Sequence, residues 1–509
     1  MPKKIDTYVI PTERESAARP PSKIIGYVSV NSKGKTSVYD AGPIDLVTKN
    51  KGFHSTKADR TASEKALNKM GFEILAGSRL GFSVAGPPEA YEELTGGKVS
   101  AYERLVLAEG GARRYSTHLD IVGSKQPECR SLGRAKTKTS KIEGVMLEEP
   151  KLLHGIFPPP IPPNVEGTYL QVPHDVSSAM GAAGANRAGH VGEDVRVAMV
   201  DSGQYAHPYF DFHSYNVASV TAMVPGTNPA VDPNGHGTGE SANIFALAPG
   251  IELHAYRATN DPSATEESRL VAAASGFIAA KEANPQILTN SWGNDTFSFP
   301  PFGPPPQSQF SFIAEIVDAV EQGIFVVFSA GNGSFSTYAQ IPGVFSAGGV
   351  FMERDLDLRA SNYASGYTSP DDWFPGRIVP DASGLVGMLP RAQYIMLPVP
   401  AGSELDVAMS NPSSDAPGDG TAANDGWARF SGTSAAAPQI AGAGALILGA
   451  RPDLTPAQVI EALSQTATDV VEGSCHPRFG NPAGPGRDEA TGFGLVNASA
   501  ALDYALTQF

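Results

Sequence analysis

Cysteine is scarce in this chain of 509 residues, which contains only Cys129 and Cys475. The two are far apart in the sequence, so no disulfide framework can be inferred, and we expect both to be unpaired. His476 follows Cys475 directly, but no further ligands stand at zinc spacing. A metal site at this pair is therefore disfavoured.

Long apolar segments are also missing. The chain begins with Lys3 and Lys4 but has no apolar segment after them, so no secretory signal is predicted. The longest run of small and apolar residues, 440–450, is too short to cross a bilayer. These absences predict a cytoplasmic protein without a membrane partner, and export by a non-classical route stays open.

Positive charge is in short supply, since the formal net charge is −15. Nucleic-acid binding depends on clustered Lys and Arg, so we expect no nucleic-acid partner. Residues 1–150 hold 24 Lys and Arg against 18 Asp and Glu, a net +6, whereas residues 151–509 hold 14 against 35, a net −21. Either a basic N-terminal domain docks on an acidic domain, or the two surfaces are unrelated and solvated.

The length and the 41% hydrophobic content favour two domains. Hydrophobic periodicity in the first part predicts a β-α-β-β-α-β order, which is typical of a small α+β ferredoxin-like domain. The expected strands are 23–30, 72–75, 80–84 and an extended segment at 98–100, and the expected helices are 62–70 and 87–94.

Composition suggests where the domains divide. A basic run rich in Gly, Ser and Thr at 130–141 and a proline-rich run at 157–163 are typical of a connector. The predicted division is a tail at 1–22, an N-terminal domain at 23–123, a connector at 124–165 and a large domain at 166–509.

The large domain alternates strands with helices, which indicates an α/β fold with a parallel sheet covered on both faces. Such sheets carry their sites at the carboxyl ends of the strands, where Asp201, Ser291 and Asn332 would lie. The expected strands are 195–200, 253–256, 287–290, 324–329 and 346–350, alternating with helices such as 267–283 and 310–322.

Three short motifs carry the chemistry: VDSG at 200–203, NGHGT at 234–238 and FSGTSAAAP at 430–438. A serine hydroxyl is a weak nucleophile until a neighbouring base removes its proton. Ser434 at the mouth of a small-residue helix is the candidate nucleophile, and His236 between two glycines is the candidate general base. Asp201, at a strand end, would fix the imidazole tautomer.

The order Asp, His, Ser and the three motifs resemble the subtilisin-like serine proteases. The resemblance implies a three-layer α/β fold with a mostly parallel central sheet, and a serine endopeptidase that forms an acyl-enzyme. Residues 326–333 (VVFSAGNG) resemble the family segment whose Asn, here Asn332, donates to the oxyanion together with the backbone N–H of Ser434. Alternatively, Asn332 is a left-handed turn residue before Gly333, which is compatible with catalysis.

The resemblance also implies substrate-binding strands. An extended peptide would pair along Ser291, Trp292 and Gly293, which face a segment made of Ser329, Ala330 and Gly331 across the primary specificity pocket. Trp292 either crowds the neighbouring subsite or is a core aromatic. The chain departs from the family at Ser202, where Thr is commoner, and at Gly239, where His is common, and neither departure removes a catalytic group.

Next to such a domain, the N-terminal domain resembles an inhibitory propeptide. The chain would then be a self-inhibited zymogen whose own N-terminal domain is an intramolecular inhibitor, with a protein or peptide as substrate. The alternatives are a permanent α+β adaptor domain, an intracellular processing protease dedicated to one peptide or partner, and an inactive binding scaffold on the same fold.

No cofactor is required by this chemistry. Calcium stabilises many relatives and remains an option as a structural ion, and acidic clusters occur at Asp355/Asp357, Asp371/Asp372 and Asp488/Glu489. None has EF-hand-like spacing, so a solvated acidic surface is the favoured interpretation.

Overall fold

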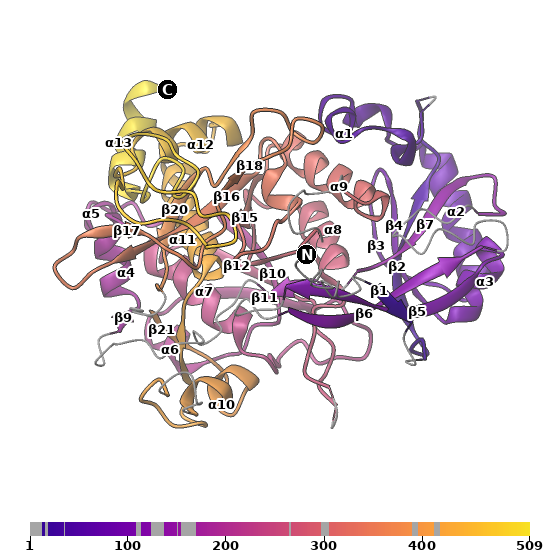
Figure 1. Cartoon of the computed structure of the whole chain (residues 1–509), viewed down its shortest axis with the longest axis horizontal. Helices are drawn as coiled ribbons and strands as arrows, with labels where there is room; N and C mark the ends of the chain where they lie inside the picture. Colours follow the sequence, from indigo (N-terminus) through magenta and orange to yellow (C-terminus); the bar gives the residue numbers. More distant parts are fainter. Residues whose placement is uncertain are drawn as a thin grey trace, which may run out of the picture.

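The computed structural model describes residues 13–15, 19–34, 36–107, 113–123, 137–149, 151–153, 169–263, 266–296, 305–388, 395–411 and 418–509. Cys129, most of the basic run at 130–141 and the proline-rich run at 157–163 lie outside these residues. An N-terminal domain and a larger domain lie side by side along the long axis (Figure 1).

A mostly parallel sheet forms the centre of the large domain, as the sequence predicts. Its strand order is β11-β12-β10-β13-β15-β16-β17, with β20 also paired to β16, and the described pairs are parallel except β16 with β17. The strands are β10 (Arg196–Asp201), β11 (Asn216–Ala222), β12 (Glu252–Arg257), β13 (Ile287–Asn290), β15 (Phe325–Ser329), β16 (Phe345–Met352), β17 (Leu358–Ala360) and β20 (Ala382–Leu385).

The inner strands β10, β13, β15 and β16 are buried on both faces, which explains why they are mostly apolar. On β15, Phe325 and Val327 belong to one core, and Val326 and Phe328 belong to the other. Because side chains alternate along a strand, each strand feeds two cores. Helices α7 (His236–Leu247) and α11 (Thr433–Ala450) fill the first core, and α8 (Ala273–Glu282) and α9 (Phe310–Glu321) fill the second.

Helix α11 packs closely on α7 because its residues are small. A Cβ at Gly442 would lie 2.7 Å from the carbonyl oxygen of Ile244, so a larger side chain would push the helices apart. The other α-helices of the large domain in the described residues are α4 (His174–Ala179), α5 (Ala182–Arg187), α6 (Pro208–Phe212), α10 (Glu404–Ser410), α12 (Pro456–Gln465) and α13 (Ala498–Gln508), and α1 (Pro43–Thr48) belongs to the N-terminal domain. No helix in the described ranges is long and apolar enough to span a bilayer.

Helix α8 begins at Ala273, later than the predicted start at residue 267. The residues before it pair instead with the segment after β12, through a bridge between Thr259 and Leu270 and a hydrogen bond from Val271 N to the Ala258 carbonyl. Short remaining strands are β8 (Leu152–Leu153), β9 (Leu170–Gln171), β14 (Trp292–Gly293), β18 (Tyr367–Thr368), β19 (Ile378–Val379), β21 (Ile395–Pro398) and β22 (Trp427–Phe430).

The N-terminal domain has a four-stranded antiparallel sheet of order β3-β4-β2-β7, which is the ferredoxin-like arrangement. Helix α2 starts five residues before the predicted helix because the Thr56 side chain caps it by accepting from Asp59 N. The elements are β2 (Ile24–Val30), α2 (Lys57–Lys69), β3 (Glu73–Gly77), β4 (Gly81–Gly86), α3 (Pro88–Thr95) and β7 (Ile142–Leu147).

Two predictions for the N-terminal domain were wrong: which segment forms the fourth strand of its sheet, and where the connector begins. Residues 98–100 begin β5 (Lys98–Leu107), which pairs with β6 (Arg113–Val122) and β1 (Glu13–Glu15) in a separate sheet. The fourth strand is β7, inside the segment assigned to the connector, where it pairs with β2. Its Ile142, Val145 and Leu147 are buried in the N-terminal core, so burial rather than the basic sequence before it determines its place.

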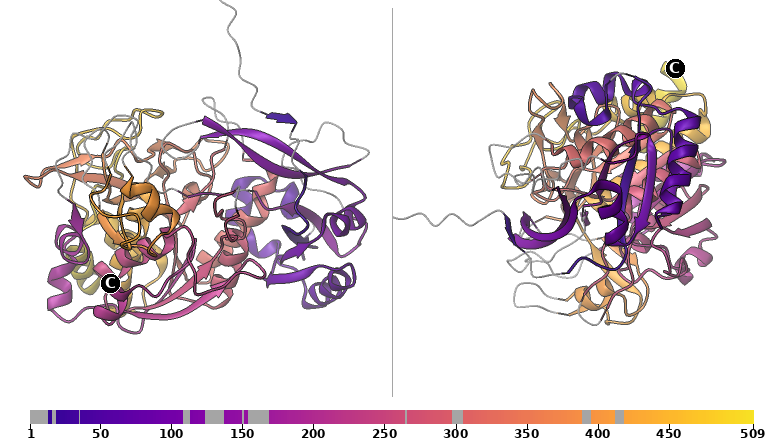
Figure 2. Two further views of the ribbon diagram at one scale, coloured as in Figure 1. Left: turned by 90° about the horizontal axis from the view of Figure 1, so that it is seen from below. Right: turned by 90° about the vertical axis from the view of Figure 1, so that its right-hand side faces the viewer.

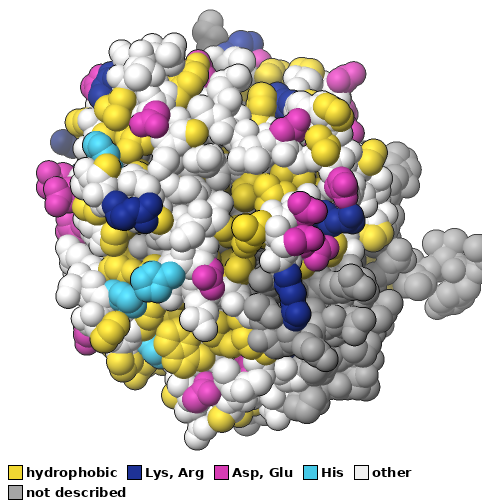
Figure 3. Space-filling model, turned by 90° about the vertical axis from the view of Figure 1, so that its left-hand side faces the viewer, with side chains coloured by type: hydrophobic (Ala, Val, Ile, Leu, Met, Phe, Trp, Pro, Cys, Tyr) yellow, Lys and Arg dark blue, Asp and Glu magenta, His cyan; other side chains and the backbone are white. Residues whose placement is uncertain are grey.

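The N-terminal sheet rests on helices α8 and α9 of the large domain (Figure 2). Leu80 and Met146 from the N-terminal domain share the second core with Phe277 and Phe312. The two domains therefore share buried apolar surface. On the side of the molecule away from the N-terminal domain, acidic and basic side chains of the described residues are scattered (Figure 3).

Candidate active site

Asp201 is the last residue of β10, and it points at the imidazole of His236, the first residue of α7. Its Oδ1 lies 2.7 Å from His236 Nδ1, and both side chains are buried. Glycine makes this approach feasible, because a Cβ at Gly237 would lie 2.2 Å from the Gly203 carbonyl oxygen and 3.0 Å from Asp201 Cβ. The carboxylate can thus hold the imidazole with Nε2 available for proton transfer.

A buried carboxylate that the sequence analysis missed ties these two segments together. Asp232 accepts hydrogen bonds from Ser202 Oγ at 2.8 Å, Gly235 N at 3.0 Å, and Thr238 N and Oγ1 at 2.9 and 2.7 Å. Ser202 Oγ in turn accepts from Gly237 N at 2.8 Å. The local sequence gave little signal, because Asp232 stands four residues before α7 begins and the N-cap position itself is Gly235.

Ser434, the second residue of α11, is fully buried beside the end of β13. Its hydroxyl donates to the Ser291 carbonyl at 3.0 Å, and the Ser291 hydroxyl donates to the Ser434 carbonyl at 2.9 Å. Helices α11 and α7 pack directly against each other, and the His236 ring lies 6.0 Å from the ring of Phe430, four residues before Ser434. Proton transfer to His236 requires the hydroxyl to turn away from Ser291, as is common in unliganded sites.

Asn332 lies just after β15, at the same edge of the sheet. Its carboxamide oxygen accepts from Thr433 N at 2.9 Å and from Thr433 Oγ1 at 3.0 Å, which fixes the side chain with its NH₂ group on the opposite side. The positive φ angles belong to the neighbouring Gly331 and Gly333, so the interpretation of Asn332 as a left-handed turn residue is wrong. The amide is thus a fixed donor next to the start of α11.

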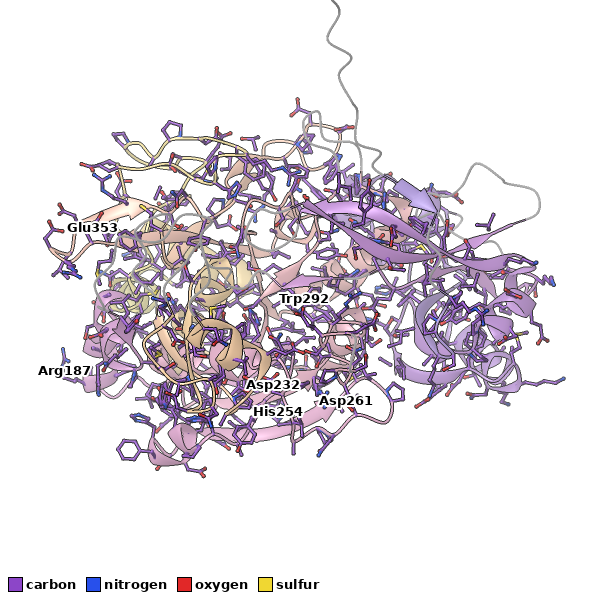
Figure 4. The ribbon with its side chains drawn as sticks, turned by 60° about the horizontal axis from the view of Figure 1, so that its bottom comes forward. Arg187, Asp232, His254, Asp261, Trp292 and Glu353 are labelled. Atoms are coloured by element: carbon purple, nitrogen blue, oxygen red, sulfur yellow. The ribbon has the colours of Figure 1, made fainter. Side chains whose placement is uncertain are left out.

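Trp292 is a core aromatic and does not line a subsite. Its side chain is fully buried, its indole N–H donates to the Val200 carbonyl at 2.7 Å, and its ring packs on Phe312, Phe328 and Tyr338. Figure 4 labels Trp292 together with Asp232. The backbone of Trp292 and Gly293, in contrast, forms β14 and pairs antiparallel with β8.

The second predicted substrate segment, Ser329, Ala330 and Gly331, begins at the last residue of β15 and is buried. Ala330 N donates to the Ala347 carbonyl at 2.9 Å, and Gly331 N donates to Thr433 Oγ1 at 3.1 Å. This segment is therefore anchored both to the sheet and to the start of α11, directly before Asn332.

Gly239, the departure from the family's common His, has a packing reason. A Cβ there would lie 2.5 Å from the ring of Phe430, the first residue of the serine motif. Cys475 is buried and unpaired, whereas Cys129 lies outside the described residues. No group of three or more His, Cys, Asp or Glu side chains placed to hold a metal ion occurs in the described part of the chain.

The mostly parallel sheet with helices on both faces places the protein in the α/β class, and comparison with known proteins gives the family. Residues 192–482 match the family model described as the subtilase family, Peptidase_S8. The chain belongs to the subtilase family.

Individual relatives agree with this assignment. The chain is similar to subtilisin E of Bacillus subtilis, at 30% identity over 322 residues, which cover 59% of this chain and 67% of that protein. It is also similar to fervidolysin of Fervidobacterium pennivorans, at 26% identity over 61% of this chain and 41% of that one. The crystal structure of fervidolysin, titled a keratinolytic enzyme related to subtilisin, superposes with a TM-score of 0.52 at 18% identity and covers 94% of this chain. The match spans 61% of the fervidolysin chain.

Proposed function

We propose that this chain is an endopeptidase that hydrolyses peptide bonds through Asp201, His236 and Ser434. The observation that carries the proposal is the buried pair of Asp201 Oδ1 and His236 Nδ1, 2.7 Å apart, beside the helix that begins with Thr433 and Ser434. An intact pair of this kind, together with a serine at the adjoining helix start, argues against an inactive scaffold on the same fold.

The residues then act in sequence. As the Ser434 hydroxyl turns to His236 and attacks the scissile carbonyl carbon, its proton passes to Nε2, and Asp201 stabilises the imidazolium at Nδ1. The imidazolium gives the proton to the leaving amine, which departs and leaves the acyl-enzyme. Water then takes the place of the amine, with His236 as base again, and releases the acid and free Ser434.

The oxyanion that forms at each addition needs donors aimed at it. The Asn332 amide is held by its own oxygen against Thr433, and the Ser434 N–H stands at the positive end of α11. We propose these two groups as the oxyanion donors, because both are fixed before a substrate arrives.

Labelling with a serine-directed fluorophosphonate tests the nucleophile. The mature protein should be labelled, and Ser434→Ala should not. Ser464→Ala, which removes another buried serine on α12, is the matched control and should be labelled as the wild type is. Undiminished labelling of Ser434→Ala would disprove the assignment.

We also propose that the N-terminal domain is an intramolecular inhibitor. In support, Leu152 and Leu153, just after that domain, pair antiparallel with Gly293 and Trp292, the strand on which a substrate would pair. This register runs toward Ser291, whose carbonyl accepts from Ser434 Oγ. We therefore expect the first bond to be cut within a few residues after Leu153, inside the predicted connector at 124–165.

Buried polar contacts between the domains support the same role. Tyr27 Oη and Ser78 Oγ of the N-terminal domain each donate to Glu315 Oε1 on α9 at 2.5 Å. Arg79 Nη2 lies 2.6 Å from Asp318 Oδ1, also on α9. The Arg79–Asp318 pair fits the idea of a basic domain docking on an acidic one, and apolar contact and hydrogen bonding add further support.

Adding the separate N-terminal piece, residues 1–153, to the mature enzyme tests the inhibitor proposal. Peptide hydrolysis should fall with the concentration of the piece. Full activity of the uncut chain, with no inhibition by the added piece, would instead indicate a permanent adaptor domain.

A further inference from the structure

A second carboxylate lies beside the candidate general base. Glu240 is four residues after His236 on α7, so the two side chains lie on the same face of the helix. Glu240 Oε1 is 3.7 Å from His236 Nε2, the nitrogen opposite the one that Asp201 holds. Asn243 Nδ2 donates to Glu240 Oε2 at 2.9 Å, whereas no described group donates a hydrogen bond to Oε1.

The surroundings of Glu240 disfavour the ionised form of its carboxyl group. The side chain is fully buried, and burial raises the pKa of its carboxyl to about 8, while the nearby His236 lowers it and Asp201 raises it. Of the elements packed on α7, α11 and β21 carry no charged residue. The other charged side chains on these elements are exposed: His174 and Asp175 on α4, Arg187 on α5 and Arg196 on β10.

We propose that Glu240 is a positioning residue for catalysis: it is a second carboxylate partner of His236 and sets how readily the imidazole takes the proton of Ser434. This inference rests on the proposed roles of His236 and Ser434. When the Ser434 Oγ–H proton moves to Nε2, an ionised Glu240 balances the positive charge on that side of the ring. Glu240 itself exchanges no atom with the substrate.

The consequence is that the two groups titrate as a pair, and the protons leave in two steps that belong to both. The first step removes one proton from the state in which both Glu240 and His236 are protonated. Part of the His236 imidazole is then neutral and can act as the general base. The second step ionises Glu240 beside a neutral imidazole, which favours the imidazolium of the transition state, so activity rises again. With Gln at position 240 only one step remains.

Nuclear magnetic resonance of the full chain tests the pairing without any need for activity. In Ser434→Ala labelled with ¹⁵N-histidine, the His236 signals, assigned by their loss in a His236→Asn variant, should shift in two steps with pH. In Ser434→Ala/Glu240→Gln they should shift in one step. One identical step in both proteins would overturn the proposal. Should the Gln variant not fold, Glu240→Leu also lacks the acid, and the same single step is expected.

The pH dependence of kcat/KM gives the second readout. Between about pH 5 and about pH 10, the wild type should rise in two steps, the second near pH ~8, and the Gln variant in one. Profiles of the same shape would overturn the inference while leaving Ser434 as the nucleophile. If instead all proteins lack activity, the proposed function fails, and the resonance titration still decides whether Glu240 and His236 are coupled.

Discussion

Replacing Glu240 by Gln should make the protein more stable at alkaline pH. The pKa of this buried carboxyl is raised from 4.5 to about 8. A pKa difference of one corresponds to about 1.36 kcal/mol, so ionisation should change the free energy of unfolding by about 5 kcal/mol in total. Below about pH 4.5 both the folded and the unfolded chain hold the proton, so the wild type and Glu240→Gln should be equally stable there. As the pH rises to about 8, only the unfolded chain releases the proton. The wild type therefore loses stability relative to Glu240→Gln.

The assay is guanidinium unfolding in the Ser434→Ala background, which prevents self-cleavage. Ser434→Ala and Ser434→Ala/Glu240→Gln are compared near pH 4.5, 6 and 9, with the gap expected to widen from about 0 to about 5 kcal/mol. Glu193→Gln, which changes an exposed carboxylate, is the control and should show no widening. A gap that is independent of pH, or a Gln variant that is less stable at pH ~9, would refute the reasoning.

Three further outcomes are expected. Asn332→Ala should lower kcat by about 10²–10³ and change KM little, because its donor matters most once charge develops on the substrate, and a change confined to KM would reject the role. Trp292→Ala should lower the free energy of unfolding by about 3–5 kcal/mol because the indole ring is buried in the core. Unchanged stability together with altered cleavage specificity would show instead that the ring lines a substrate subsite. Tyr27→Phe in the added piece of residues 1–153 should weaken inhibition about tenfold to a hundredfold through the lost bond to Glu315, whereas Lys23→Ala, an exposed ion pair, should not.

The residues of the candidate site could be named from the sequence because each stands in a short local motif. Asp201 ends an apolar strand, and His236 and Ser434 each start a helix beside glycine. Parallel strands bring their carboxyl ends to one edge, so the order of strands and helices also predicted that Asp201, Ser291 and Asn332 would lie there. Glycine at 237 and 239 is explained only by atoms from distant segments, which a sequence does not show.

The features that the sequence did not reveal depend on contacts between segments far apart in the chain. The role of Asp232 depends on its hydrogen bonds to Ser202 and to the start of α7, which the sequence does not show. Glu240 looks like an ordinary helical acid until its burial is known. Strand β7 was hidden because its apolar pattern follows a basic, Gly- and Ser-rich run, and its partner β2 is more than a hundred residues away.

Intact mass measured over time on the purified full chain tests the central claim most directly. The wild type should convert to two pieces, with the new terminus within a few residues after Leu153, and Ser434→Ala should keep the full-length mass under the same conditions. Cleavage of Ser434→Ala at the same place and rate, with no other protease present, would contradict the account.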